Sequence, residues 1–163
     1  WYHPKQAAPK WEIARLPECP DGGEWVLGGT YEWTVNIHCS EIPENGQDYA
    51  HFGAVHGVPG PPATEFRIEG WVRRNTVVAE MNTPKGPMTG KIDATATGPG
   101  QSMTEFIDVT HVVMNQQATP ISAQQTHLRW QLYHTPGLSD GKLRVTQARM
   151  RDLVKQVEQD IPI

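Results

Sequence analysis

The sequence has few cysteines, no excess of basic charge and no long apolar run. Its 163 residues contain no run of about 18 apolar residues, which excludes a transmembrane helix within them. The 14 Lys and Arg residues stand against 18 Asp and Glu, giving a formal net charge of −4. Nucleic-acid-binding domains usually carry a basic patch. The chain is therefore expected neither to span a membrane nor to bind nucleic acid.

Cys19 and Cys39 are the only two cysteines in the chain. Two cysteines are too few for a disulfide scaffold, and neither lies in a C-x-x-C or C-x-H pair. A reducing, cytoplasmic compartment is the simplest expectation. A single Cys19–Cys39 disulfide and a membrane association of the complete protein stay open as alternatives.

The length and composition are those of one globular domain. Apolar residues make up 37% of the chain, which is enough to build a core, and the 15 Gly and 14 Pro predict many turns. The sequence starts at Trp1 rather than Met and stops shortly after a helical pattern. We therefore expect it to be a piece of a longer protein.

Segments rich in β-branched and aromatic residues predict an antiparallel sheet. Residues 1–24 show no period and are expected to be an irregular segment that leads into the domain at 25–163. Strands are predicted at 25–38 (around a Gly-Gly turn), 64–74, 76–81, 88–97, 103–114 and 126–134. Turns are expected at Arg74-Asn75, Pro84-Lys85-Gly86 and Gly98-Pro99-Gly100.

Two helices are predicted on either side of these strands. Residues 45–57 favour a short helix that Asn45 caps and Gly57 ends. Residues 142–161 favour a longer closing helix, because one apolar stripe follows the helical period through Met150, Leu153, Val154, Val157 and Ile161. The expected fold class is therefore α+β, with an antiparallel sheet, a short helix near its start and a long C-terminal helix.

The short predicted helix carries ionisable residues at positions typical of an inward face. Asp48, His51, Phe52, Val55 and His56 fall at i, i+3, i+4, i+7 and i+8. Burying unpartnered ionisable groups costs several kcal/mol, so these groups would be paired, bound to a ligand or facing a cavity. The alternative is that this face of the helix points to solvent.

Two histidines and a distant carboxylate could together hold a metal ion. His51 and His56 lie about 140° apart on a regular helix, so they would converge from two sides or require a π-turn. Neutral imidazole is the commonest metal ligand in proteins. Asp160 follows Val157 by three residues on the apolar face of the closing helix, where a cation would explain a carboxylate. The alternative is that Asp160 merely ends the helix.

Two imidazoles and one carboxylate form the facial triad of non-haem Fe(II) oxygenases. This ligand set leaves three coordination positions open, where dioxygen and a substrate can meet. Zn(II) on the same residues would imply hydrolysis instead, with Glu44 as the nearest candidate base.

The region around these histidines resembles a known motif. Residues 44–56 (ENGQDYAHFGAVH) are similar to the iron motif N-x-x-D-x-x-H-x4-H of Rieske-type oxygenases. Four other segments look like the branch that contains the 3-ketosteroid 9α-hydroxylase oxygenase components and the cholesterol 7-desaturases. These are the opening residues 1–4 and 9–11 (WYHP and PKW), residues 40–43 (SEIP) and the closing residues 158–163 (EQDIPI).

The resemblance implies a helix-grip (START-like) fold and assigns roles within it. His51, His56 and Asp160 would bind the mononuclear iron, and the gap of 160 − 56 = 104 residues suits the family. Asp48 would take the family's catalytic bridging role. It would hydrogen-bond towards a histidine of the Rieske cluster across a subunit boundary, within a homotrimer, and help to pass electrons.

The resemblance also implies a partner domain and a reaction. A Rieske [2Fe–2S] cluster needs two Cys and two His ligands, and this sequence lacks the family's C-x-H and C-x-x-H pairs. The cluster is therefore expected in an N-terminal domain that is missing here, and this fragment alone is expected to be inactive. Electrons would come from NAD(P)H through a reductase or ferredoxin, and dioxygen would hydroxylate or desaturate a steroid or sterol. The alternative function is a lipid- or sterol-binding module of the same fold without a metal.

The remaining candidates have weaker support. Asp108 is a rival carboxylate ranked below Asp160. Four histidines on or near predicted strands are expected to be structural or exposed: His38, His111, His127 and His134. Five side chains could line a sterol cavity or fill the core equally well: Met81, Met103, Met114, Phe106 and Trp130.

Overall fold

The structure, a computed structural model, describes residues 8, 12–46, 48–56, 65–83, 86–98 and 100–160. In these residues, one strand is followed by two short helices, then by six strands and finally by one long helix. In chain order the elements are β1 (Val26–Val35), α1 (Glu41–Asn45), α2 (Tyr49–Val55), β2 (Glu65–Glu69), β3 (Val72–Thr83), β4 (Gly86–Thr97), β5 (Gln101–Ile107), β6 (His111–Ser122), β7 (Gln125–His134) and α3 (Asp140–Asp160).

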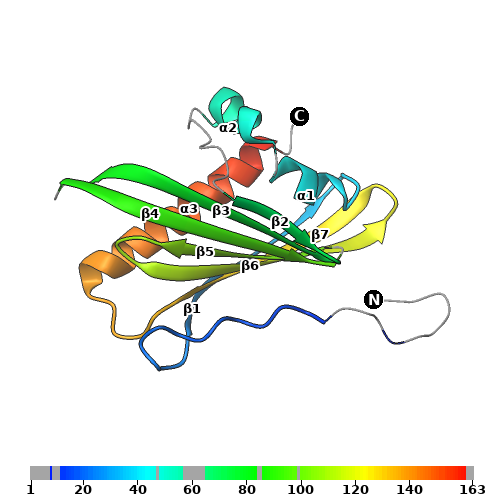
Figure 1. Ribbon diagram of the computed structural model, residues 1–163. Coiled ribbons are helices and arrows are strands. Elements are labelled where there is room, and N and C mark those ends of the chain that lie inside the picture. The colour runs from blue at the N-terminus through cyan, green and yellow to red at the C-terminus, as the bar shows by residue number, and fades with distance from the viewer. Residues whose placement is uncertain are drawn as a thin grey trace.

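Seven antiparallel strands form one sheet in the order β1-β7-β6-β5-β4-β3-β2. From β2 to β7 each strand pairs with the next one in the sequence, and β1 completes the sheet by pairing with β7. The long helix α3 crosses one face of this sheet (Figure 1). This arrangement is a helix-grip fold, and it confirms the predicted α+β class.

The core lies between α3 and the neighbouring strands β6, β7 and β1. Successive strand residues alternate between the two faces of the sheet. Val112, Met114, Trp130 and Leu132 are buried on the face that meets Met150 of α3. Leu153 and Val157 pack against the same cluster, so this part of the predicted apolar stripe is confirmed, whereas Ile161 lies outside the described residues.

One predicted strand, 103–114, is wrong because the chain reverses within it. Asp108 makes this turn by accepting a 3.0 Å hydrogen bond from the backbone N–H of Thr110, as aspartates often do in turns. The segment is divided between β5 and β6, and β6 runs on to Ser122. The sheet therefore has one strand more than the sequence predicted.

Two predicted turns are also wrong. The turn between β2 and β3 lies at Gly70-Trp71, because Gly70 adopts a left-handed φ of 61° that other residues rarely adopt. Asn75, which was expected in that turn, is buried within β3. The expected turn at Gly28 is instead an irregularity inside β1, where a Cβ would lie 3.0 Å from Cδ2 of His134.

Other connections agree with the sequence. Gly98 and Gly100 connect β4 to β5 with φ values of 60° and 98°. Thr83 pairs with Gly86 at the β3–β4 connection, although residues 84–85 and 99 lie outside the described part of the chain. The strand predictions at 25–38, 88–97 and 126–134 correspond to β1, β4 and β7.

Residues 12–25, which precede β1, are irregular and follow the sheet face opposite α3 (Figure 1). The amide of Gln101 exchanges hydrogen bonds of 3.2 and 3.3 Å with the backbone of Ala14. Cys19 and Cys39 are both free thiols, so the disulfide alternative is wrong. Among the described residues, no helix is long and apolar enough to cross a membrane.

Asp108 and Arg149 connect the β5–β6 turn to α3. The Arg149 guanidinium forms an ion pair with Asp108, donates a 3.3 Å hydrogen bond to Thr110 Oγ1 and lies 5.2 Å from the ring centroid of Phe106. The Asp108 side chain is only 6% exposed. Removing one partner of such a pair leaves the other charge poorly solvated.

We therefore expect Asp108→Ala to lower the free energy of unfolding by about 2–3 kcal/mol in urea denaturation. The control is Lys91→Met, which breaks the exposed 2.6 Å ion pair with Asp93 and should cost less than about 1 kcal/mol. Equal costs for the two variants would contradict the structural role of Asp108.

Candidate metal centre

The short helix predicted at 45–57 is present as α2 (Tyr49–Val55), and a separate helix α1 (Glu41–Asn45), which the sequence did not predict, precedes it. Asn45 is the last residue of α1, and α2 begins only at Tyr49. Asp48 caps α2, because its Oδ1 accepts hydrogen bonds from the backbone N–H groups of Ala50 at 3.0 Å and of His51 at 3.3 Å. The predicted Asn45 cap is therefore wrong, and the predicted end at Gly57 lies outside the described residues.

His51 lies in the first turn of α2 with its orientation fixed by the backbone. Its Nδ1 forms a short hydrogen bond with the carbonyl oxygen of Asp48. Because a carbonyl oxygen can only accept, the proton must be on Nδ1. In the neutral ring, Nε2 then carries the lone pair, and this atom lies 4.0 Å from Oδ1 of Asp160.

His56 follows the last residue of α2 and is thus outside the regular helix. Its ring is nearly perpendicular to that of His51, with an interplanar angle of 77° and centroids 5.1 Å apart. The rings converge because the chain leaves the helix between them, so the alternative of a π-turn is wrong. Nε2 of His56 lies 3.2 Å from Oδ1 of Asp160.

Asp160 is the last residue of α3, and Figure 1 shows this end of the helix beside α2. Ligand atoms of His51, His56 and Asp160 all lie within 4.8 Å of one another. The side chains are 13%, 2% and 20% exposed, so the group is mostly shielded from solvent. The structure thus brings together the three residues that the sequence singled out.

The donor atoms of these residues fit a divalent cation. Two ligand atoms that are each about 2.1 Å from an ion lie at most about 4.2 Å apart. The distances of 4.0 and 3.2 Å from Asp160 Oδ1 to the two Nε2 atoms satisfy this limit. The ligand atoms of all three residues lie within 4.8 Å of one another, so a bound ion would require at most a small further approach. A carboxylate that faces an imidazole lone pair is repelled unless positive charge lies between them, so the arrangement favours a bound cation.

The fourth predicted site residue, Asp48, adjoins this group and is exposed. Its Oδ1 is occupied by the α2 cap, and no hydrogen bond of its Oδ2 is found within the described residues.

The other polar candidates have structural environments. Asp108 pairs with Arg149 and is not grouped with the histidines. Each of the four histidines expected to be structural or exposed has a protein partner. His38 contacts Ser40 at 2.8 Å, His111 contacts Glu105 at 3.0 Å, His127 lies 3.9 Å from Glu32, and His134 contacts the carbonyl oxygen of Thr135 at 2.8 Å.

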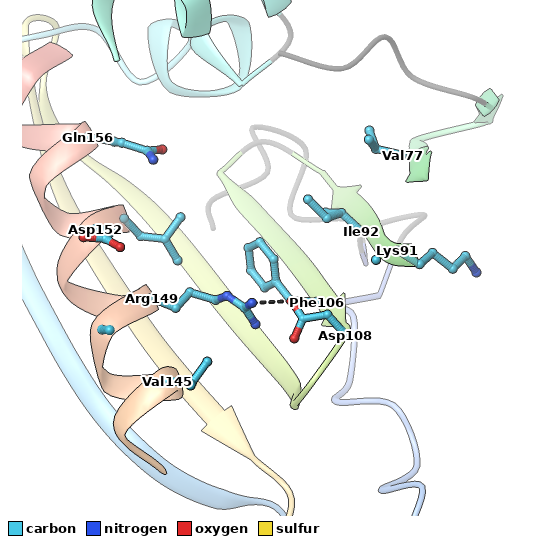
Figure 2. Close-up of a pocket in the computed structure, with 12 residues that line it drawn as sticks. Val77, Lys91, Ile92, Phe106, Asp108, Val145, Arg149, Asp152 and Gln156 are labelled. Atoms are coloured by element: carbon cyan, nitrogen blue, oxygen red, sulfur yellow. Dashed lines mark hydrogen bonds and ion pairs between the residues drawn. The ribbon is translucent and has the colours of Figure 1, made fainter. Parts of the chain in front are cut away.

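A cavity of about 430 Å³ lies between α3 and strands β3 to β5 (Figure 2). Arg149 reaches across it from α3 to Asp108, whereas Lys91 extends away from it. A hydrogen bond to Asp93 raises the pKa of Lys91 above its ordinary value. The apolar part of the lining consists of Val77, Ile92, Phe106, Val145, Ala148 and Leu153.

The cavity ends one helical turn before the candidate metal ligand. Gln156 lines it, and Asp160 follows four residues later, about 6 Å along the helix axis. Of the side chains predicted to line either a cavity or the core, Phe106 lines this cavity, whereas Met103, Met114 and Trp130 are buried. The side chain of Met81 lies outside the described part.

Comparison with protein families gives a match over the whole chain. The family described as "3-Ketosteroid 9alpha-hydroxylase C-terminal domain" matches residues 1–163. The chain belongs to this family. Membership confirms the resemblance to the branch of 3-ketosteroid 9α-hydroxylases and cholesterol 7-desaturases and makes the chain a C-terminal domain of this family.

Curated relatives agree with the family. The chain is 48% identical over 65 residues to cholesterol 7-desaturase of Caenorhabditis elegans, and 41% identical over 56 residues to that of Drosophila melanogaster. These matches cover 40% and 34% of this chain but only 15% and 13% of the relatives. The chain therefore matches a small part of much longer enzymes.

Solved structures share the fold at low sequence identity. Dicamba monooxygenase with non-haem iron and dicamba matches with a TM-score of 0.60 and 14% identity, over 98% of this chain and 54% of that one. The quaternary ammonium Rieske monooxygenase CntA matches with a TM-score of 0.59 and 13% identity, over 83% and 38%. An aromatase/cyclase from Streptomyces matches with a TM-score of 0.52 and 11% identity, over 85% of this chain and 90% of that one.

Replacement of Asp48 should separate its capping role from any role of its charge. Asp48→Ala removes the acceptor for the Ala50 and His51 amides, which we expect to cost α2 about 1 kcal/mol and to raise hydrogen exchange of these amides about fivefold. Asp48→Asn keeps an acceptor oxygen and should exchange at nearly the wild-type rate. Equal acceleration in both variants would show that Asp48 does not cap α2.

Proposed function

We propose that this domain holds a mononuclear Fe(II) on His51, His56 and Asp160 and uses dioxygen to hydroxylate or desaturate a steroid or sterol. The supporting observation is the convergence of Nε2 of both histidines on the Asp160 carboxylate. When bound, such an iron supplies the redox chemistry that activates dioxygen, and two neutral ligands with one anion leave positions open for it. The family and the oxygenase relatives support the same class of reaction.

The cavity supports an apolar substrate. It lies on the face of α3 that leads to Asp160, and its walls are largely apolar. A rigid hydrocarbon placed along Leu153 and Gln156 would have one end near the metal ligands. Apolar walls would exclude water from that end and orient the C–H bond to be attacked.

Electrons must come from another centre. We propose that Asp48, an exposed residue, accepts a hydrogen bond from a histidine of a Rieske [2Fe–2S] cluster, in a neighbouring subunit of a trimer. NAD(P)H would supply this cluster through a reductase or ferredoxin. The exposed position of Asp48, three residues before His51, is the observation that favours this bridge.

The same fold could serve as a lipid-binding module, since the cavity alone would suit that function. The convergence of two histidines and an aspartate favours the enzyme, because a pure binding module has no use for it. A zinc hydrolase has less support. Glu44 is exposed on α1, and among the described residues it does not belong to the group formed by His51, His56 and Asp160.

Anaerobic Fe(II) titration followed by EPR of the nitric oxide adduct tests this proposal. We expect one iron per chain and a high-spin nitrosyl signal in the wild type. Asp160→Ala and His51→Ala should lose the signal while remaining folded, because each removes one of three ligands.

His127→Ala is the matched control, since His127 is a partly exposed histidine that contacts Glu32 rather than the cluster. It should retain stoichiometric iron. A folded wild-type chain that binds no iron, or equal binding by Asp160→Ala, would overturn the metal site and favour the binding module.

A further inference from the structure

Gln159 lies against the imidazole of His56 on the side opposite Asp160. It precedes Asp160 on the last turn of α3, and its Oε1 is 3.2 Å from Nδ1 of His56. The Nε2 atom of the same ring is 3.2 Å from Asp160. Two consecutive residues of α3 thus contact the two nitrogen atoms of one histidine. The sequence motif includes Gln159 but assigned it no role.

This contact allows two arrangements of protons. In one, Nδ1–H of His56 donates to Oε1 of Gln159, and the lone pair of Nε2 faces Asp160. In the other, Nε2–H donates to Asp160, and the Gln159 amide is rotated so that its NH₂ group donates to Nδ1. A side-chain amide can present either end, so the distance alone does not choose between them.

His51 shows which arrangement a metal centre needs. The Asp48 carbonyl can only accept a hydrogen bond, so His51 carries its proton on Nδ1 and directs Nε2 towards Asp160. An ion between the three residues requires a lone pair on Nε2 of His56 as well. Only the arrangement in which Oε1 of Gln159 accepts a hydrogen bond from Nδ1–H of His56 supplies this lone pair.

We infer that Gln159 is a positioning residue that fixes the tautomer and ring orientation of His56, so that Nε2 is presented to the metal. This inference rests on the proposed iron site. The Asp48 carbonyl oxygen and the Gln159 side chain each accept a hydrogen bond from Nδ1 of one histidine, His51 and His56 respectively. Only the Gln159 acceptor belongs to a side chain, so only this one can be removed by substitution. Partners of this kind keep metal-binding histidines oriented and raise their basicity.

Three variants distinguish this role from a general effect on the helix end. Gln159→Leu removes the acceptor and keeps a similar size. Gln159→Glu keeps an acceptor oxygen at the same position. Glu158→Leu is the matched control, because Glu158 adjoins Gln159 in α3 and is likewise exposed, whereas Gln159 is the residue that contacts His56.

The first readout needs no metal. Nitrogen-15 NMR of the metal-free chain, at a pH where imidazoles are neutral, reports which ring nitrogen carries the proton. We expect Nδ1–H for His56 in the wild type and in Gln159→Glu. In Gln159→Leu the population should shift towards Nε2–H, which then donates to Asp160.

The second readout is the Kd for Fe(II), measured anaerobically. Gln159→Leu should weaken binding about 10- to 100-fold, the range typical of lost partners of metal ligands. Gln159→Glu and Glu158→Leu should leave Kd unchanged.

Wild-type tautomer and wild-type Kd in Gln159→Leu would overturn the role of Gln159 while leaving the iron site intact. Absence of iron binding by the wild type would instead overturn the iron site, and the tautomer would still report whether Gln159 orients His56.

Discussion

The approach of the Asp160 carboxylate to two imidazole nitrogens is the contact on which the candidate site depends. It joins α2, which follows the first strand, to the last residue of a helix that begins after the last strand. These segments can meet only if α3 is held at the correct position along the sheet. Met150, Leu153 and Val157 provide this constraint by packing against strands β6, β7 and β1. Asp160 follows Val157 by three residues, so the core packing also fixes the position of the carboxylate.

The long helix serves the core and the site with two different stripes of side chains. One stripe, including Met150 and Val157, covers the β1–β7–β6 half of the sheet. The other, including Arg149 and Gln156, borders the cavity above β3 to β5. Leu153 belongs to both. Because the core-packing stripe of α3 covers only part of the sheet, a cavity that can accommodate a ligand remains above β3 to β5. This cavity extends along α3 towards the candidate metal ligands.

Local sequence signals predicted the parts of the fold that depend on regular periods. The closing helix, three of the strands and the grouping of His51, His56 and Asp160 followed from spacing and from the motif. Features that depend on one side chain's hydrogen bonds were missed. Asp108 turns the chain inside an apolar run, and Asp48 rather than Asn45 caps the helix that carries His51. Gln159 had no recognisable signal, because its role depends on a contact 103 residues away in the sequence.

X-ray absorption at the iron edge of the anaerobically Fe(II)-loaded chain tests the central claim most directly. The outer-shell scattering of imidazole distinguishes histidine ligands from water and carboxylate. The account predicts two imidazoles and further oxygen ligands around one iron, with one imidazole lost in His56→Ala. An iron environment without imidazole scattering, or one unchanged in His56→Ala, would contradict it.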